Sequence, residues 1–263
     1  MSIDSEYKVA FDAFNSGDRL RALPVLNKLA NVGHGKSLHA LGVIYFQGIG
    51  VGRDLPKALA SFAKAAEAGI VDSQYTLAQM RKNGWGGDRD YHEAAKWYTA
   101  AAEAGKIEAL FDLGQMHREG LGFQVNMKEA LSCYLRAAEE GEPRAQYSLG
   151  LIYLRGDGGI ERNAVLAEKW ARKSAEHGSS DGECLMGLLY MGGHGLRRDA
   201  NLALDWYLRA AEHGHSHAQY TVGWILVNGE GVRADRARAL PWLCKARDQG
   251  NKDAADLLRQ LGE

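Results

Sequence analysis

The sequence predicts an all-α solenoid of about seven antiparallel helix pairs. Two observations lead to this prediction. Apolar helical segments alternate with short loops along the whole chain, and a glycine closes every second segment at a spacing of 36 or 37 residues. A fixed period of this length is typical of solenoids, in which each unit packs only on its neighbours. The closing glycines are Gly33, Gly69, Gly105, Gly141, Gly178, Gly214 and Gly250.

Residues 1–35 are predicted to form a shortened first helix pair that caps the solenoid. Asp4 or Ser5 is expected to cap a helix that ends near Asn15, and a second helix is expected over residues 20–30, after Asp18. A divergent terminal unit is expected because its outer face meets water. Residues 251–263 are predicted to form the capping helix at the other end.

Six full units are predicted between the caps, at residues 36–71, 72–107, 108–143, 144–180, 181–216 and 217–250. In five of them a glycine follows a large apolar residue inside the first helix. Glycine there costs about 1 kcal/mol relative to alanine, so its recurrence predicts that two helices approach closely. These glycines are Gly42, Gly114, Gly150, Gly187 and Gly223.

The boundaries of the helices follow from capping chemistry. A glycine is expected to end each first helix, and an Asp or Asn side chain is expected to accept the free amides of each second helix. Glu93 and Glu129 are placed to complete capping boxes. The predicted C-cap glycines are Gly48, Gly84, Gly120, Gly156, Gly193 and Gly229, and the predicted N-caps are Asp54, Asp90, Asn126, Asn163, Asp199 and Asp235.

Two columns of small residues, seven positions apart, occupy one face of the second helices and predict tight helix packing. The first column is Ala58, Ala94, Ala130, Ala167, Ala203 and Ala239, and the second is Ala65, Ala101, Ala137, Ser174, Ala210 and Ala246. A tryptophan column at Trp97, Trp170, Trp206 and Trp242 is interpreted as packing rather than as a ligand site.

Over residues 36–250 the chain follows the pattern A-x-x-x-L-G-x-x-Y-x-x-G-x-G-V-x-x-[DN]-x-x-x-A-x-x-W-Y-x-x-A-A-E-x-G, which resembles the Sel1-like repeat, a relative of the tetratricopeptide repeat. Tyr45, Tyr153 and Tyr190 fit the pattern, whereas Arg81, His117 and Leu226 depart from it. The resemblance implies a right-handed superhelix of helix pairs. It also implies an adaptor, a regulator or a partner of secreted or signalling proteins, mostly in bacteria.

In similar repeats the first helices line a concave groove, which gives the candidate binding positions. The polar half is expected to present Tyr75, Gln79, Lys82, Gln115 and Arg118, and the apolar half Tyr147, Leu151, Leu154, Leu188, Met191, Tyr220, Trp224 and Val227. Contiguous exposed apolar surface usually marks a binding site, and Trp is a common hot-spot residue. The alternative is that neighbouring helices bury most of these side chains against each other.

Charge and composition exclude several kinds of partner. With 32 basic and 33 acidic residues, the net charge of -1 does not favour nucleic acid or an anionic membrane. The polar N-terminus resembles no signal peptide, so a cytoplasmic protein is expected. Cys133, Cys184 and Cys244 have no regular spacing and are expected to be buried thiols, and the His213, His215 and His217 cluster lacks a fourth metal ligand.

These observations favour a non-enzymatic scaffold that binds a protein or peptide in its groove as a cytosolic regulator or adaptor, and is a monomer or weak dimer. No catalytic residue, metal or cofactor is expected. The first alternative is an immunity partner that neutralises a toxic bacterial effector. A less favoured alternative is a β-lactam-binding or hydrolysing enzyme. The relatives credited with that activity are exported and carry a disulfide in each repeat, and neither feature is expected in this chain. The loop residue Trp85 is a weaker candidate contact.

Overall fold

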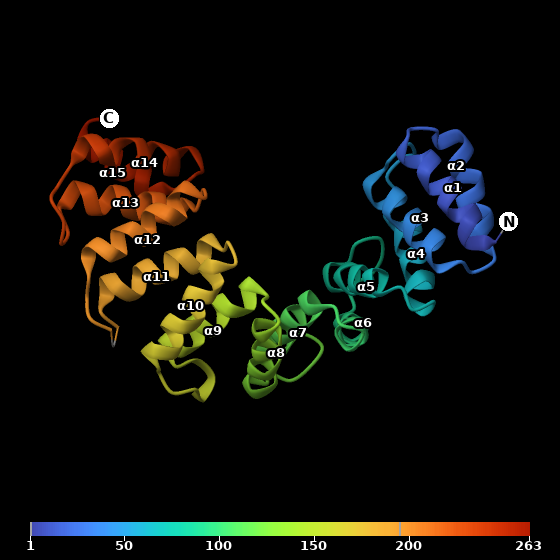
Figure 1. Ribbon diagram of the computed structural model, residues 1–263, viewed down its shortest axis with the longest axis horizontal. Coiled ribbons are helices and arrows are strands. Elements are labelled where there is room, and N and C mark those ends of the chain that lie inside the picture. The colour runs from blue at the N-terminus through green and yellow to red at the C-terminus, as the bar shows by residue number, and fades with distance from the viewer. Residues whose placement is uncertain (1, 195) are drawn as a thin grey trace. The chain divides into compact units, whose positions relative to one another are not determined.

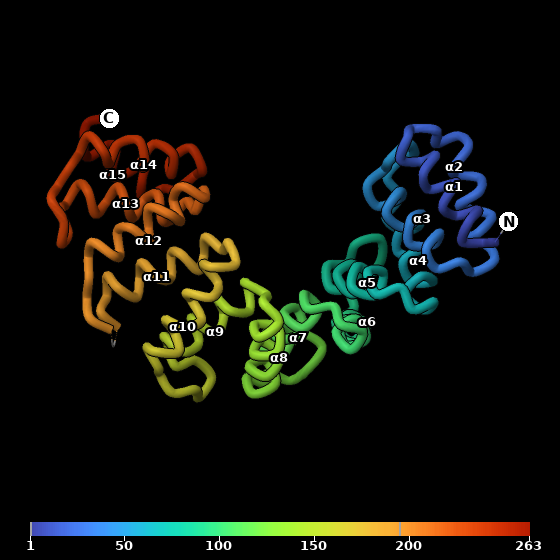
Figure 2. The backbone as a smooth tube through the Cα atoms, in the orientation of Figure 1, coloured from blue at the N-terminus to red at the C-terminus, as the bar shows by residue number. Residues whose placement is uncertain are grey.

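The computed structural model describes residues 2–194 and 196–263, and these fold as an all-α chain without strands, which confirms the predicted fold class. Two compact units are present, one up to Cys133 and one from Tyr134 onward. Within each unit consecutive helices run back and forth and are joined by short turns (Figures 1 and 2). The boundary between the units falls inside α8.

Helices α1 to α14 come in pairs of equal length along the chain, and the shorter α15 follows the last pair. The first unit contains α1 Ile3–Asn15, α2 Arg19–Asn31, α3 Gly35–Gln47, α4 Leu55–Glu67, α5 Val71–Asn83, α6 Tyr91–Glu103, α7 Ile107–Glu119 and the start of α8 Met127–Glu139. The second contains the end of α8, α9 Pro143–Arg155, a 3₁₀ turn at Asp157–Gly159, α10 Ala164–Glu176, α11 Ser180–Gly192, α12 Ala200–Glu212, α13 Ser216–Asn228, α14 Arg236–Asp248 and α15 Lys252–Leu261.

The predicted caps of the six internal pairs are confirmed. Each predicted Asp or Asn accepts a hydrogen bond from the backbone N–H three residues later, at 2.9 to 3.1 Å. Each predicted C-cap glycine has a φ between 60° and 76°, in the left-handed region that glycine adopts without a steric penalty. Capping chemistry alone therefore places these helix boundaries.

The first helix begins earlier than predicted. The Ser2 hydroxyl, rather than Asp4 or Ser5, caps α1 by accepting from the Ser5 N–H at 3.3 Å. Asp4 instead lies in the first turn, where an acidic side chain is favourable and where it also pairs with Lys36. Sequence alone does not distinguish which of the three nearby polar residues Ser2, Asp4 and Ser5 is the cap, because each could place an oxygen near the free amides.

A backbone hydrogen bond ties each second helix to the end of the first. The N–H of the N-cap residue donates to a carbonyl near the end of the preceding helix, as in Asp54 to Tyr45 at 2.9 Å and Asp235 to Leu226 at 2.7 Å. All six internal pairs form this bond. It also prevents the predicted capping boxes, because the N-cap N–H is already used, and Glu93 pairs with Arg81 instead.

The small-residue columns lie in the tightly packed contacts within and between helix pairs. Every member of the two columns is fully buried, with 0% exposure. The helix glycines have the predicted role: a Cβ on Gly42 would lie 2.7 Å from the ring of Phe62, and a Cβ on Gly187 would lie 2.8 Å from the ring of Tyr207. Real Cβ atoms do not approach other atoms so closely, so these positions accept only glycine while the helices keep their spacing.

We expect Gly42→Ala to destabilise the protein by about 1–3 kcal/mol, although alanine is the better helix former. The reason is that Phe62 is 1% exposed and its ring has no room to move away from the added methyl group. Thermal unfolding followed by circular dichroism measures the effect. Gly52→Ala is the matched control, since a Cβ there meets nothing within 4 Å. A neutral or stabilising Gly42→Ala would contradict the packing argument.

A buried glutamine joins neighbouring helix pairs in the second unit. Gln146 donates to the Ala138 carbonyl at 2.9 Å, and its oxygen lies 2.8 Å from Nδ1 of His177. Gln219 repeats the first bond to Ala211 at 3.1 Å. Glu183 takes the corresponding position one unit later than Gln146, is 5% exposed and pairs with His213 at 2.8 Å. A carboxylate has no N–H to donate to a carbonyl.

We expect Glu183→Gln to stabilise the protein by about 1 kcal/mol. The amide would keep the contact with His213, as Gln146 does with His177, would gain a donor for the neighbouring carbonyl, and would remove a charge from a buried position. Thermal unfolding at neutral pH measures this. The reverse change, Gln146→Glu, should lower the midpoint. A lower midpoint for Glu183→Gln would show that the charged pair with His213 is the more stabilising arrangement.

Candidate partner-binding surface

The first helices of the second unit carry an apolar strip, which we define as Leu151, Leu154, Leu188, Met191, Trp224 and Val227. Leu188 and Trp224 are 41% and 38% exposed. The other four are half-buried. They pack beside core residues of α11 and α13. Neighbouring helices thus cover part of the strip, whereas Leu188 and Trp224 are exposed to solvent.

A pocket of about 330 Å³ opens beside Leu188, between α9, α11 and the start of α13. Its apolar wall is formed by Leu151, Leu185, Leu188 and the rings of Tyr147 and Tyr207, and its polar groups come from Arg155, Asp181, Cys184, His215 and His217. Concave sites with apolar walls and a few placed polar groups are typical of binding sites. The predicted residues Tyr147, Leu151 and Leu188 are thus brought together in one site.

The histidine side of the pocket is held by its own hydrogen bonds. Nδ1 of His215 accepts from the Ala218 N–H at 3.1 Å and caps α13. Nε2 therefore carries the proton, and it lies 3.2 Å from Asp181. Burial, and then the neighbouring His215, lower the pKa of His217. The Asp181 carboxylate therefore already accepts a hydrogen bond from His215 inside the pocket.

The histidine cluster is divided among different contacts. His213 pairs with Glu183, His215 with Asp181, and the ring of His217 lies 6.3 Å from that of Tyr220. Among the described residues no group of three His, Cys, Asp or Glu side chains is arranged to hold a metal ion.

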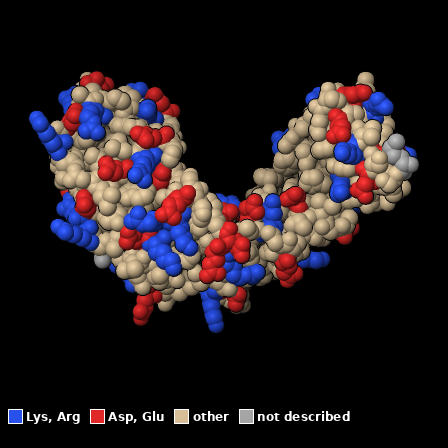
Figure 3. All heavy atoms as spheres, in the orientation of Figure 1, with Lys and Arg blue, Asp and Glu red and all other residues tan. Residues whose placement is uncertain are grey.

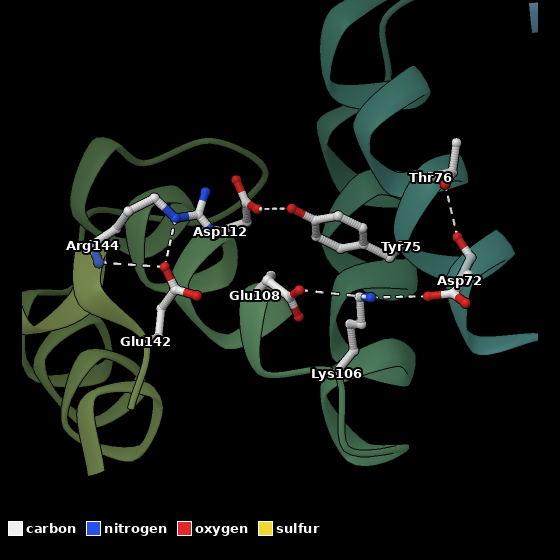
Figure 4. Close-up of polar contacts among 8 residues, drawn as sticks. All are labelled: Asp72, Tyr75, Thr76, Lys106, Glu108, Asp112, Glu142 and Arg144. Atoms are coloured by element: carbon white, nitrogen blue, oxygen red, sulfur yellow. Dashed lines mark hydrogen bonds and ion pairs between the residues drawn. The ribbon is translucent and has the colours of Figure 1, made fainter. Parts of the chain in front are cut away.

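In the first unit, two of the predicted groove residues are engaged with a buried carboxylate. The Tyr75 hydroxyl donates to Asp112 at 2.9 Å, and the Lys82 ammonium lies 3.1 Å from the same carboxylate (Figure 4 shows Tyr75 on α5 pointing to Asp112 on α7). Asp112 is 6% exposed. Sequence reasoning missed it, although a carboxylate directly before Leu113 is conspicuous where other units have Ala, Thr, Ser or Leu.

The remaining predicted residues of the first unit differ in exposure. Gln79 and Gln115 are half-buried, and Arg118 is exposed and pairs with Glu119 at 3.1 Å. Nearby, Lys106 bridges Asp72 and Glu108 at 2.9 and 3.7 Å (Figure 4), and its hydrogen bond lowers the pKa of Asp72. Trp85 is 41% exposed, with its ring 5.7 Å from Phe46. The charged groove positions of this unit, Lys82 and Arg118, are therefore both engaged in ion pairs.

Charge is mixed elsewhere on the surface. On the face shown in Figure 3, basic and acidic side chains are interspersed, with no field of one sign. Every helix in the described part of the chain is too short or too polar to cross a lipid bilayer.

The repeat geometry and the comparison with known families agree. The Sel1 repeat family matches six consecutive segments, at residues 35–70, 71–106, 107–142, 143–179, 180–215 and 216–251. The chain belongs to the Sel1 repeat family. Sel1 repeats are generally non-enzymatic scaffolds for protein–protein interaction.

Solved structures show the same fold. A protective antigen of uropathogenic Escherichia coli with an SLR fold is 30% identical with a TM-score of 0.85, over 96% of this chain and 55% of that chain. This Sel1 repeat chain therefore spans about half of that protein. A Sel1 repeat protein from Oxalobacter formigenes is 28% identical with a TM-score of 0.81, over 92% of this chain and 96% of that chain.

More distant likeness extends to an immunity protein from Pseudomonas aeruginosa. It is 18% identical with a TM-score of 0.53, over 81% of this chain and 82% of that chain. At this identity the likeness shows the fold alone. A comparison with curated proteins finds no match.

The thiols of this Sel1 repeat protein differ from the prediction that all three are buried. Cys133 is buried, whereas Cys184 and Cys244 are half-buried, and none forms a disulfide. Cys184 lies in the pocket, where burial, and then Asp181, raise the pKa of its thiol to about 12.

We expect iodoacetamide to label Cys184 at least about tenfold more slowly in the native protein than in the unfolded chain at pH 8, because the thiolate is the reactive form. The rate should rise with pH until the thiol ionises. Mass spectrometry of the peptide that contains Cys184 separates its labelling from that of the other cysteines. Equal rates in native and unfolded protein would contradict the raised pKa.

Proposed function

We propose that this chain is a non-enzymatic scaffold whose apolar strip on α9, α11 and α13 binds a protein partner, as a cytosolic regulator or adaptor. The observation that supports it best is the exposure of Leu188 and Trp224 beside a concave pocket. Burying such side chains against a partner is favourable by about 25 cal/mol per Å² of apolar area.

An immunity role is the alternative form of the same proposal. It is supported by the description of the Pseudomonas aeruginosa neighbour, whose likeness to this chain is one of fold. In that case the partner is a toxic effector and binding abolishes its activity. An effector encoded beside this chain, and its inhibition by the purified protein, would separate this role from that of an adaptor.

The test is affinity capture from a lysate of the organism that encodes the chain. We expect the double variant Leu188→Glu and Trp224→Glu to recover the partner about tenfold less than the wild type, because hot-spot residues of this type dominate interface energies. Quantitative mass spectrometry measures the recovery. Circular dichroism establishes that the variant is folded.

Val165→Glu is the matched control. Val165 lies on α10, is 68% exposed, and is outside the strip, so its replacement introduces the same charge at an exposed apolar position of the same unit. We expect full recovery of the partner with this variant. Equal recovery with the double variant and the wild type would place binding elsewhere and would refute the strip as the binding surface.

A further inference from the structure

We infer that the pocket beside Leu188 binds a peptide segment in which a bulky apolar side chain lies next to a carboxylate, with the apolar group between α9 and α11 and the carboxylate on Arg155. This inference rests on the proposed function and specifies the chemistry of the partner. It is carried by two features of the pocket, namely the walls that a side chain would fill and one cation that forms no ion pair with any described residue.

The walls fit an apolar side chain of the partner. Leu151 and Leu188 face the pocket from two neighbouring first helices, and Leu185 closes it from the core side, where it is 3% exposed. A volume of about 330 Å³ is at the low end for ligand sites. It is therefore suited to one large side chain and the backbone beside it rather than to a folded domain.

Arg155 is the charge in the pocket that lacks a partner. It is exposed in the last turn of α9 and forms no ion pair with any residue that the structure describes. Asp181, the pocket's carboxylate, is already paired with His215 at 3.2 Å. Arg155 is consequently the charged group of the pocket that has no ion-pair partner among the described residues, and a guanidinium binds a carboxylate through two parallel hydrogen bonds.

The same features disfavour other anions. Phosphate groups and nucleic acid are bound by several cations or by aligned backbone amides, whereas the pocket offers one guanidinium beside apolar walls. Tyr147 adds a hydroxyl whose pKa is raised by burial, so it remains a neutral donor. A ligand with one apolar group and one carboxylate would contact the apolar walls, the Arg155 guanidinium and the Tyr147 hydroxyl.

The experiment pans a phage library of short random peptides against the wild-type protein, after depletion on Leu188→Glu. We expect the enriched peptides to share a large apolar residue with Asp, Glu or a free C-terminus close to it. Panning on Arg155→Glu should retain the apolar preference and replace the acidic residue with Lys or Arg. Arg233→Glu is the matched control, because Arg233 is exposed in a loop of the same unit outside the pocket, and it should keep the acidic preference.

The selected peptide is then synthesised with a fluorescent label for anisotropy. Its affinity should fall about tenfold for Arg155→Glu and remain unchanged for Arg233→Glu. An enriched motif whose charge does not depend on residue 155 would overturn the inference, and so would the absence of any motif. Neither result would refute the proposed function if lysate capture still depends on Leu188 and Trp224, since a folded partner would then bind the strip without using the pocket.

Discussion

A single backbone hydrogen bond determines the geometry of each helix pair. The N–H of the residue that caps the second helix donates to a carbonyl near the end of the first, at 2.7 to 3.1 Å in all six internal pairs. The acceptor residue is Tyr in three pairs but Arg81, His117 or Leu226 in the others, because a carbonyl serves whatever side chain accompanies it. This bond holds the two helices together at one end. Their close contact along the rest of their length then requires the alanine columns and glycines such as Gly42 and Gly187.

This constraint separates positions that fold the chain from positions that are free to bind. Backbone hydrogen bonds and small residues hold the two helices of a pair together. Side chains at the groove positions of the first helices are therefore free to vary. The two units use that freedom differently. In the first, Asp112 engages Tyr75 and Lys82 and satisfies their polar groups. In the second, Leu188 and Trp224 are 41% and 38% exposed.

Much of the fold was predictable because it depends on local rules. An Asp or Asn cap, a left-handed glycine and a small residue every seventh position act within one or two turns, and spacing alone reveals them. The Tyr75–Asp112 contact and the pocket beside Leu188 depend on helices about one repeat apart and on the side-chain conformations of both. The sequence places Leu151 and Leu188 in one column, but it does not show that Arg155 is left without an ion pair there while Asp181 accepts a hydrogen bond from His215.

The repeat also explains how a scaffold of this kind can acquire specificity without a change of fold. Apolar contacts such as those of Leu188 supply affinity with little discrimination, whereas a charge beside them selects among partners. The position of Arg155 is occupied by Gln47, Asn83, Glu119, Gly192 and Asn228 in the other units. Because the backbone is the same at each of these positions, one substitution changes the charge presented to a partner while the hydrogen bond and the small-residue columns that define the pair remain intact.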